Sequence, residues 1–272
     1  MRPVERVRRV GHQTSNDIKR VAQTLTRFDN GFSILGDILW RRPDELTYVT
    51  DGVTVTCPNR DGARFAVYEL FADDAYQLPW FTRGLRADPV VLDLGGHIGS
   101  FSLAISQLFP QARVDAYEPT PFTSGYLRRN IEQNQLGDRL RVFESAISAH
   151  AGVLVMAIAD DGSAHNGVML VGAPGMASIE VPSTALADAF AAAPGPVDLV
   201  KLDIEGAEYE AILESSPDLW SPVSRVVMEY HEMPGRSWDD LETFFAGVGL
   251  EVARRDPSTD HLGTAWLSRG PV

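Results

Sequence analysis

The sequence predicts an α/β fold in which a doubly wound, mostly parallel sheet carries helices on both faces. From residue 89 onward, apolar runs of strand length alternate with segments of helical periodicity. The first run, residues 90–94, has the nearly continuous hydrophobicity of a strand that is buried on both faces. A glycine-rich turn follows it and leads into a helix. These observations predict a Rossmann-like domain.

The chain before this alternating pattern is predicted to be an N-terminal extension with helical and β structure. Residues 1 to about 50 have weak helical periodicity, because four apolar side chains recur at spacings of three or four. Two short strands are expected next, separated by a turn-forming Asn-Arg-Asp-Gly. The extension is assigned to residues 1–60 and the following domain to residues 61–272. The periodic side chains are Ile18, Val21, Leu25 and Phe28, and the two strands are expected at residues 53–57 and 64–70.

Strand and helix candidates alternate through the rest of the chain, which is the pattern of βαβ units and a parallel sheet. A long loop, residues 160–167, separates two short additional strands. No internal repeat, low-complexity tract or hinge between independent domains is visible in the sequence. Helices are predicted at residues 100–109, 122–133, 184–192, 207–214 and 238–246, and strands at residues 90–94, 113–118, 140–147, 153–157, 178–181, 199–204, 225–230, 251–255 and 264–268.

Length and composition narrow the possible functions. The 272 residues suit one large domain or one domain with an appendage. A formal net charge of −13 disfavours binding to nucleic acid through a basic face and binding to anionic membranes. No apolar stretch approaches the roughly 20 residues of a bilayer span, and no signal peptide is visible. The single cysteine, Cys57, excludes an internal disulfide and is interpreted as a packed thiol, so we expect a soluble cytoplasmic protein.

The glycine-rich turn, Asp93-Leu-Gly-Gly-His-Ile-Gly99, has the features of a ligand-binding turn. Glycines let the backbone pass close to a ligand, and the N-terminus of the following helix offers free N–H groups. Asp93 stands where a dinucleotide-binding fingerprint has its first glycine. A carboxylate there repels a pyrophosphate, whereas it can accept a hydrogen bond from the ammonium group of an amino acid.

A second acid, Glu118, ends the next predicted strand, 19 residues beyond Gly99. A carboxylate at this place can accept hydrogen bonds from both hydroxyls of a ribose, and Pro119 fixes the turn that presents it. A nucleoside joined to a zwitterionic amino acid fits Asp93 and Glu118 better than NAD does, and S-adenosylmethionine matches that description. The predicted cofactor-binding residues are Asp93, Gly95, Gly96, His97, Gly99, Glu118, Pro119, Ser145, Ala146 and Asp203.

A second group of polar residues is predicted at the same edge of the sheet. One strand ends in Lys-Leu-Asp-Ile-Glu-Gly-Ala-Glu, which begins at Lys201, and the next ends in Met-Glu-Tyr-His. Open α/β sheets bind ligands outside the carboxyl ends of their strands, so both segments direct polar groups into one crevice. Lys201 and Asp203 share one strand face, as do Glu229 and His231. Burial of Lys201 requires an acidic partner, which Asp203 or Glu229 could supply.

Transfer of an activated methyl group mainly requires that the reacting atoms be held in line, but a hydroxyl acceptor must also lose its proton. Histidine is the usual base near neutral pH. His231 is the first candidate because it lies beside Glu229, His97 is the second and His165 the third. A divalent metal held by Asp203, Glu229 and His231 is an alternative that the loose ligand spacing does not favour. The predicted catalytic residues are His231, Asp203, Glu229 and Lys201.

Four motifs follow one another at suitable spacing: Val91-Leu-Asp-Leu-Gly-Gly-His-Ile-Gly-Ser-Phe-Ser102, Tyr117-Glu-Pro119, Val200-Lys-Leu-Asp-Ile-Glu-Gly-Ala-Glu208 and Glu229-Tyr-His231. As a set they resemble the FkbM family of methyltransferases. The likeness covers about residues 65–268, and the segment that begins at Asp203 is its most specific part. The chain has His97 where the family more often has asparagine, which leaves the role of His97 open.

The resemblance implies a class I methyltransferase sheet of seven strands, mostly parallel, in which the last strand is antiparallel. It also implies S-adenosylmethionine as the methyl donor, held by Asp93, Gly95, Gly99 and Glu118. Family members often O-methylate hydroxyls on natural products, sugars or glycans, and N-methylation also occurs. The extension of residues 1–60 lies outside the likeness, and we expect it to cap the active site or to form a contact in a homo-oligomer.

The leading hypothesis is therefore methylation of a hydroxyl on a small-molecule acceptor. An NAD-dependent oxidoreductase shares the strand, the glycine turn and the acid, but the sequence lacks its full glycine fingerprint. A non-catalytic module that retains the fold is the third hypothesis, and the carboxylates at positions 93, 118 and 203 argue against it.

Overall fold

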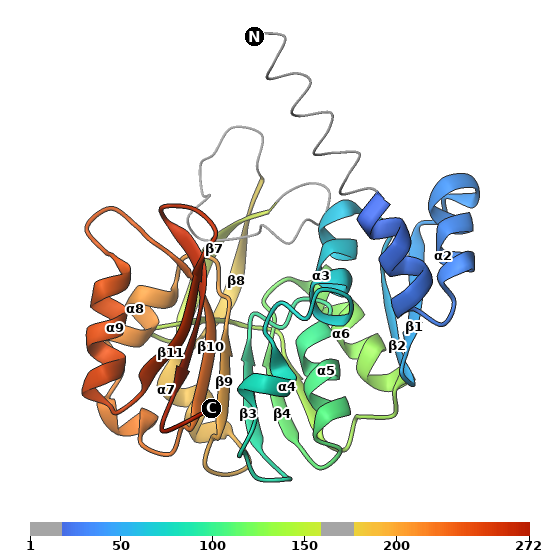
Figure 1. The fold of residues 1–272 in the computed structure, drawn as a ribbon. Helices are drawn as coiled ribbons and strands as arrows, with labels where there is room; N and C mark the ends of the chain where they lie inside the picture. Colours follow the sequence, from blue (N-terminus) through green and yellow to red (C-terminus); the bar gives the residue numbers. More distant parts are fainter. Residues whose placement is uncertain (1–17, 159–176) are drawn as a thin grey trace, which may run out of the picture.

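The computed structural model describes residues 18–158 and 177–272. Its central sheet has seven strands: β3 Val90–Leu94, β4 Arg113–Tyr117, β5 Leu140–Phe143, β9 Leu199–Leu202, β10 Arg225–His231, β11 Glu251–Pro257 and β12 Leu262–Ser268. They lie in the order β11-β12-β10-β9-β3-β4-β5 (Figure 1). All neighbours from β10 to β5 are parallel, whereas β12 is antiparallel to both of its neighbours. The predicted α/β sheet with an antiparallel last strand is confirmed.

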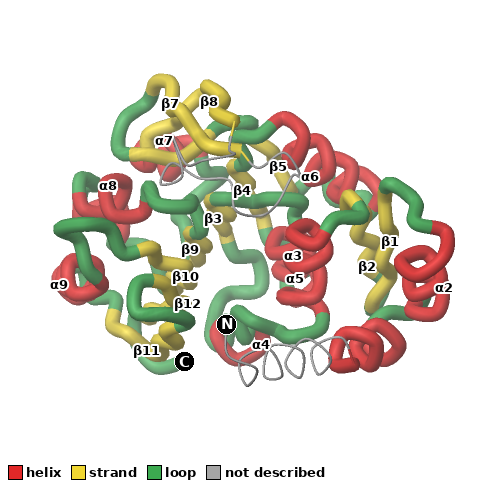
Figure 2. Tube along the Cα trace, turned by 90° about the horizontal axis from the view of Figure 1, so that it is seen from above, coloured by secondary structure: helices red, strands yellow, loops and turns green. Residues whose placement is uncertain are grey.

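Helices cover both faces of this sheet, as the view along it in Figure 2 shows. Successive side chains along each strand point to opposite faces of the sheet, so each strand contributes to both cores. In β3, for example, Leu92 and Leu94 pack on one face and Val91 packs on the other. The helices on the Leu92 face are α7 Leu186–Ala192, α8 Glu208–Leu213 and α9 Trp238–Gly247, and those on the Val91 face are α3 Asp61–Phe71, α4 Leu78–Phe81, α5 Ser100–Leu108 and α6 Pro121–Gln133.

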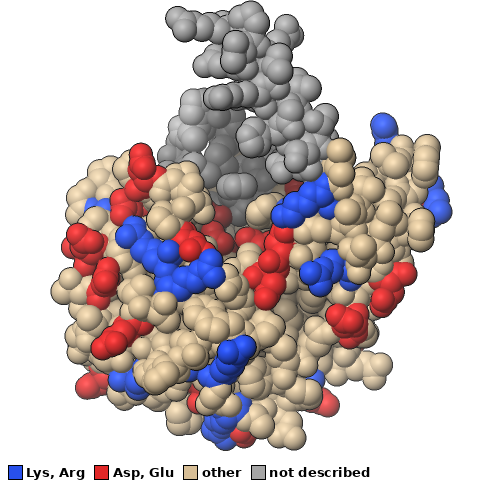
Figure 3. Space-filling view, in the orientation of Figure 1, with Lys and Arg blue, Asp and Glu red and all other residues tan. Residues whose placement is uncertain are grey.

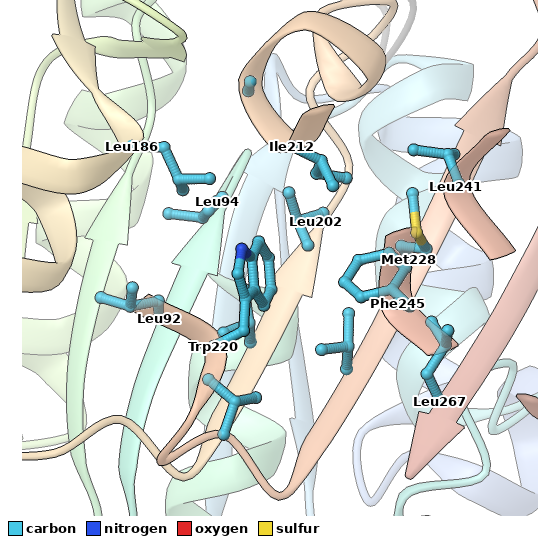
Figure 4. Packing of buried hydrophobic residues seen from close by; sticks show 14 of the residues in the cluster. Leu92, Leu94, Leu186, Leu202, Ile212, Trp220, Met228, Leu241, Phe245 and Leu267 are labelled. Atoms are coloured by element: carbon cyan, nitrogen blue, oxygen red, sulfur yellow. The ribbon is translucent and has the colours of Figure 1, made fainter. Parts of the chain in front are cut away.

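The core beneath α7, α8 and α9 is centred on Trp220, which lies among leucines of neighbouring strands in Figure 4. Its ring makes edge-to-face contacts with Phe190 and Phe245. The indole N–H donates a hydrogen bond of 2.8 Å to Ser215 Oγ, so the buried polar atom has a partner. This face is therefore an apolar support for the sheet.

The opposite face of the sheet becomes polar toward the carboxyl ends of its strands. Val91, Leu199 and Val227 belong to the core beneath α4 and α5. Because side chains alternate, the residues two positions farther along the same strands point to the same side. Those residues are Asp93, Lys201 and Glu229.

The N-terminal segment differs from its prediction in two places. Residues 64–70, predicted as a strand, lie within α3, because Ala63, Ala66 and Val67 recur at helical spacing and pack against the domain. This short apolar run fits either structure, and tertiary packing selects the helix. Residues 45–50, predicted as helical material, form β1 Glu45–Thr50, which pairs with β2 Val53–Pro58.

The rest of the N-terminal segment is helical, as predicted. Residues 18–27 form a helix, and α2 Gly31–Gly36 and a short π-helix η1 Asp37–Arg41 follow it. Three of the four periodic apolar side chains are exposed, and the fourth, Phe28, packs edge-to-face against Tyr48 and Tyr68. Cys57 is buried in β2, in agreement with its interpretation as a packed thiol.

Side-chain amides attach the β1-β2 hairpin to α6. The backbone N–H of Thr56 donates to Asn130 Oδ1 (2.8 Å), and Asn130 Nδ2 donates to the carbonyls of Thr56 and Ile98. Asn130 is fully buried, so these bonds satisfy polar groups that would otherwise be costly to bury. The hairpin therefore packs on the sheet domain through specific contacts. No helix in the described part of the chain is both long and apolar enough to cross a bilayer.

A second correction concerns the strand predicted at residues 140–147. It is divided into β5, which ends at Phe143, and β6 Ala146–Ser148, which joins a separate three-stranded sheet. That sheet also contains β7 Gly152–Ile158 and β8 Ala177–Ala185, which agree with the two additional strands predicted from the sequence. The predicted helix of residues 184–192 begins later, as α7, because its first two residues pair within β8. The predicted loop of residues 160–167 lies outside the described residues.

Candidate active site

A cavity of about 330 Å³ lies at the carboxyl ends of the parallel strands, where open α/β sheets bind ligands. It is bounded by the turns after β3 and β4, by α3, by the carboxyl ends of β9 and β10, and by the beginning of β12. Figure 3 shows acidic side chains near the upper centre of the face that is visible there. Asp93, Gly99 and His231 are not among the lining residues. The predicted site residues that line the cavity are Gly95, Gly96, His97, Glu118, Pro119, Ser145, Ala146, Lys201, Asp203 and Glu229.

The glycine turn has the backbone conformation that its composition predicts. Gly95 and Gly99 have φ values of 84° and 93°, in the left-handed region. A Cβ atom on Gly95 would lie 1.8 Å from the carbonyl oxygen of Asp203, so only glycine fits. His97 also has a positive φ, of 47°. Asparagine and histidine both tolerate this conformation better than most side chains, which gives a physical reason for either residue at this position.

Asp93 is fully buried behind the glycine turn. Its Oδ2 accepts a hydrogen bond of 2.6 Å from Ser102 Oγ, and its Oδ1 lies 3.6 Å from Lys201 Nζ without a hydrogen-bond partner. Burial raises the pKa of Asp93, and the charge of Lys201 opposes this effect. The contact that we predict between Asp93 and a ligand's ammonium group stays a prediction.

Lys201 is buried, and its position agrees with the prediction that it needs an acidic partner. Its Nζ donates a hydrogen bond of 2.5 Å to the Gly95 carbonyl and lies 3.5 Å from Asp203 Oδ2. Burial by itself would lower the pKa of Lys201, but the charges of Asp203 and Asp93 outweigh it and raise the pKa. The protonated lysine therefore ties the glycine turn to the end of β9.

Glu118 lies at the cavity with both carboxylate oxygens partly satisfied by the protein. One oxygen accepts hydrogen bonds from the backbone N–H and the hydroxyl of Thr120, and the other accepts one from the backbone N–H of His97 at 3.0 Å. Burial raises the pKa of Glu118, although these bonds oppose the shift. A carboxylate oxygen can accept two hydrogen bonds, so the oxygen that faces His97 retains an acceptor position.

His231 is held by two carboxylates that are not those predicted. Its Nδ1 lies 3.3 Å from Glu208 Oε1 and its Nε2 lies 3.5 Å from Glu205 Oε2. Burial by itself would lower the pKa of His231, but the hydrogen bond to Glu208 and the nearby negative charges raise it to about 9. An imidazole that carries its proton at neutral pH cannot accept another, so this environment argues against His231 as the general base.

The other two candidates for the general base are His97 and His165. His97 lines the cavity, and burial lowers its pKa to about 4, so its imidazole is neutral. It is a weak base, because a group with this pKa has little affinity for a proton at neutral pH. His165 lies outside the described residues.

A direct titration of His231 tests its assignment. We expect an imidazole pKa of about 9 in NMR spectra of the folded protein, because the two carboxylates stabilise the imidazolium form. The His231→Gln variant identifies the resonance. A measured pKa below 7 would contradict the paired imidazolium and would restore His231 as a base candidate.

The unfavoured metal alternative receives no support from the arrangement of the described side chains. In that part of the chain, no three His, Cys, Asp or Glu residues are positioned to hold a metal ion. His231, one ligand of that alternative, contacts Glu205 and Glu208 rather than Asp203 and Glu229.

Several cavity residues were not identified from the sequence. Glu69 belongs to the segment predicted as a strand, and its helical spacing from Ala66 is the signal that would have placed both on one face. Tyr76 is buried and donates a hydrogen bond of 3.2 Å to Glu229 Oε1, a contact between residues 153 positions apart that no local pattern reveals. Glu205 and Ser100 also line the cavity, and both lie within the motifs.

Comparison with known proteins agrees with this geometry. The family model described as Methyltransferase FkbM domain matches residues 93–254, more than half of the chain. Methyltransferase sdnD of Sordaria araneosa is 25% identical over 224 residues, which cover 71% of this chain and 83% of that protein. The 31-O-demethyl-FK506 methyltransferase FkbM of Streptomyces tacrolimicus is 27% identical over 243 residues, which cover 78% of this chain and 92% of that protein.

Among solved structures, the METTL16 MTase domain has a TM-score of 0.51 and 12% sequence identity, with coverage of 89% of this chain and 79% of that chain. At this identity the likeness concerns the fold alone. The resemblance predicted from the four motifs is confirmed by the family match, which begins at Asp93 and includes the glycine turn, Glu118 and the segment after β9. The chain therefore belongs to the FkbM methyltransferase family and is an enzyme of the methyltransferase type.

Proposed function

We propose that this protein transfers the methyl group of S-adenosylmethionine to a hydroxyl oxygen of a small molecule in natural product biosynthesis. The observation that carries the proposal is the cavity at the carboxyl ends of β3, β4, β9 and β10, where the glycine turn and Glu118 meet a group of partly buried carboxylates. The likeness to a methyltransferase whose name gives 31-O-demethyl-FK506 as its substrate supports an oxygen acceptor on a small molecule.

The residues present fit S-adenosylmethionine. The backbone of Gly95 and Gly96 borders the cavity without side chains, so a ligand can lie against the turn. Glu118 retains an acceptor position for a ribose hydroxyl. The buried hydroxyl of Ser100 lines the cavity without a hydrogen-bond partner in the described structure, and it can donate to the carboxylate of the amino-acid moiety.

The protein's task in this reaction is to position the acceptor and to remove its proton. S-adenosylmethionine supplies an activated methyl group on a sulfonium. We propose that the ionised form of Glu229 is the proton acceptor. Glu229 lines the cavity, and burial raises its pKa to about 8, so its carboxylate, once ionised, is a stronger base than an exposed carboxylate. Tyr76 orients the carboxylate by donating a hydrogen bond to Oε1. Asp203 holds Lys201, which in turn fixes the carbonyl of Gly95.

Calorimetric titration with S-adenosylmethionine tests the proposed cofactor. We expect binding by the wild-type protein and a loss of affinity of roughly tenfold to a hundredfold in Glu118→Ala, because that variant loses a charged acceptor for the ribose. Glu132→Ala, on the exposed side of α6, removes the same charge away from the cavity and is expected to bind normally.

Two results would contradict the proposed function. Absence of binding by the wild-type protein at millimolar S-adenosylmethionine would reject the cofactor. Binding of NAD in its place, with an absorbance change from nicotinamide reduction, would instead support the oxidoreductase hypothesis. Equal affinity in Glu118→Ala and the wild-type protein would leave the cofactor but reject the assignment of Glu118.

A further inference from the structure

One half of the cavity is unusually rich in carboxylates. Two of them have a cationic partner: Asp203 lies 3.5 Å from Lys201 Nζ, and Glu205 lies 3.5 Å from His231 Nε2. The other two are Glu69 of α3 and Glu229 of β10.

Glu69 and Glu229 have no ionic partner among the described residues. Glu229 accepts a hydrogen bond from Tyr76, whereas no described residue donates to the carboxylate of Glu69. Burial of a carboxylate without a cation is costly, and the cost falls when a positively charged ligand binds nearby. The pair therefore favours a cation in the cavity.

Charged residues from three segments of the chain act on Glu69: the end of β9, the segment after α3, and the N-terminal helix. Burial raises its pKa to about 7, and the charges of Asp203 and Asp73 act in the same direction. Lys201, at the floor of the cavity, and Arg20, in the N-terminal helix of residues 18–27, oppose the shift. Lys201 is engaged with Gly95, with buried Asp93 and with partly exposed Asp203, and Arg20 forms an ion pair with Asp73.

Glu229, on β10, has a similar environment. Burial raises its pKa to about 8, and the charges of Asp203 and Glu69 act in the same direction. Lys201 and His231 oppose the shift. Because the charge of Glu69 raises the pKa of Glu229, a cation that favours the ionised form of both carboxylates affects the protons of both.

A second, independent observation favours a ligand in this cavity. Ser100 is 4% exposed, lines the same cavity, and its Oγ has no hydrogen-bond partner in the described structure. It stands in the first turn of α5, where the helix N-terminus favours a negatively charged group. A ligand with a carboxylate for Ser100 and a cationic centre for the acidic pair satisfies both parts of the cavity.

We propose that Glu69 and Glu229 recognise the positive charge on the sulfur of S-adenosylmethionine and so distinguish the methyl donor from its neutral product, S-adenosylhomocysteine. This inference rests on the proposed function. The sulfonium stabilises the ionised carboxylates, and the carboxylates stabilise the sulfonium, because charges interact more strongly in a partly buried cavity than in bulk water. Binding of the donor therefore releases protons from the pair, whereas binding of the product does not.

The same coupling operates during the reaction. As the acceptor oxygen forms its bond to the methyl carbon, the bond from carbon to sulfur breaks and its electron pair remains on sulfur, which becomes a neutral thioether. The proton of the acceptor hydroxyl passes to the carboxylate of Glu229. Loss of the sulfonium charge raises the proton affinity of the carboxylate at that step and weakens the hold on the cofactor product.

Titration of S-adenosylmethionine and S-adenosylhomocysteine into three proteins tests this inference: the wild type, Glu69→Gln, and the control Glu210→Gln. Glu69→Gln removes the charge but keeps the size of the side chain, and Glu210 is an exposed carboxylate on α8. We expect Glu69→Gln to lose roughly tenfold in affinity for S-adenosylmethionine and less than about twofold for S-adenosylhomocysteine. Glu210→Gln is expected to match the wild type for both ligands.

Repetition of the titrations near pH 7.5 in two buffers with different ionisation enthalpies measures the number of protons that the protein releases when each ligand binds. We expect proton release on binding of the donor to the wild type, reduced in Glu69→Gln and in Glu229→Gln. Equal losses for both ligands, or unchanged affinity for both, would overturn charge recognition while the proposed function stands. Failure of the wild type to bind either ligand would overturn the proposed function as well.

Discussion

Replacement of Lys201 by methionine is expected to destabilise the folded protein by about 3–5 kcal/mol, the range for a buried ion pair that loses one partner. Methionine keeps the length of the side chain but leaves Asp93 fully buried with no cation nearby and leaves the Gly95 carbonyl without its donor. Chemical denaturation followed by circular dichroism measures the change. We expect the variant to lose cofactor binding too, because the glycine turn is no longer tied to β9.

The stability that Lys201→Met loses should depend on pH, and the titration of buried Asp93 sets the direction of that dependence. The pKa of Asp93 is already raised in the folded state by burial, and removal of Lys201 raises it further. Between the unfolded and the folded pKa of this acid the folded state binds the extra proton, so stability falls as pH rises through that interval. The deficit of Lys201→Met is therefore expected to be smaller at pH 5 than at pH 8.

Lys19→Met is the matched control, because Lys19 is the only other lysine in the sequence. Its side chain is 58% exposed and pairs with Asp73 at the surface. Exposed pairs of this kind contribute about 0–1 kcal/mol, so the control should remain close to the wild type. A Lys201→Met variant as stable as Lys19→Met would show that the buried network does not hold the turn.

Substitution of alanine for Gly95 is expected to cost roughly 3 kcal/mol of stability and to abolish binding of S-adenosylmethionine. The methyl group would lie 1.8 Å from the carbonyl oxygen and 2.8 Å from the carbonyl carbon of Asp203, both backbone atoms. The residue also has a φ of 84°, which a side chain disfavours by about 1–2 kcal/mol. The turn and the end of β9 must therefore separate, and the cavity changes shape. Denaturation and calorimetric titration measure the two losses.

Gly125→Ala provides the control for this substitution. Gly125 lies within α6, where an added Cβ meets no atom within 4 Å and φ is not positive. Alanine favours a helix over glycine by about 1 kcal/mol, so this variant should be as stable as the wild type or more stable. If Gly95→Ala retained wild-type stability and affinity, the close approach of the turn to β9 would have no role in binding.

The sequence by itself determined the order of strands and helices in most of the sheet domain, and it placed the candidate site at the carboxyl ends of the strands, where the cavity lies. Long apolar runs such as residues 90–94 are interpretable because a buried parallel strand needs continuous hydrophobicity. Glycine at position 95 and glutamate at position 118 are interpretable because each satisfies a local requirement: a left-handed turn and a strand-end carboxylate. The buried strand, the glycine turn and the strand-end carboxylate each depend on residues that are adjacent in the chain, so the sequence is sufficient to predict them.

Only the tertiary structure decided which side chains meet in the cavity. Glu69 and Tyr76 come from the segment before β3, and they meet Glu229 in the cavity only because α3 and the following loop pack near the end of β10. The environment of His231 was likewise decided at a distance, by the buried carboxylate of Glu208. A pKa depends on the burial and charges that surround a group in space, so the proton state of His231 follows from packing rather than from the local sequence.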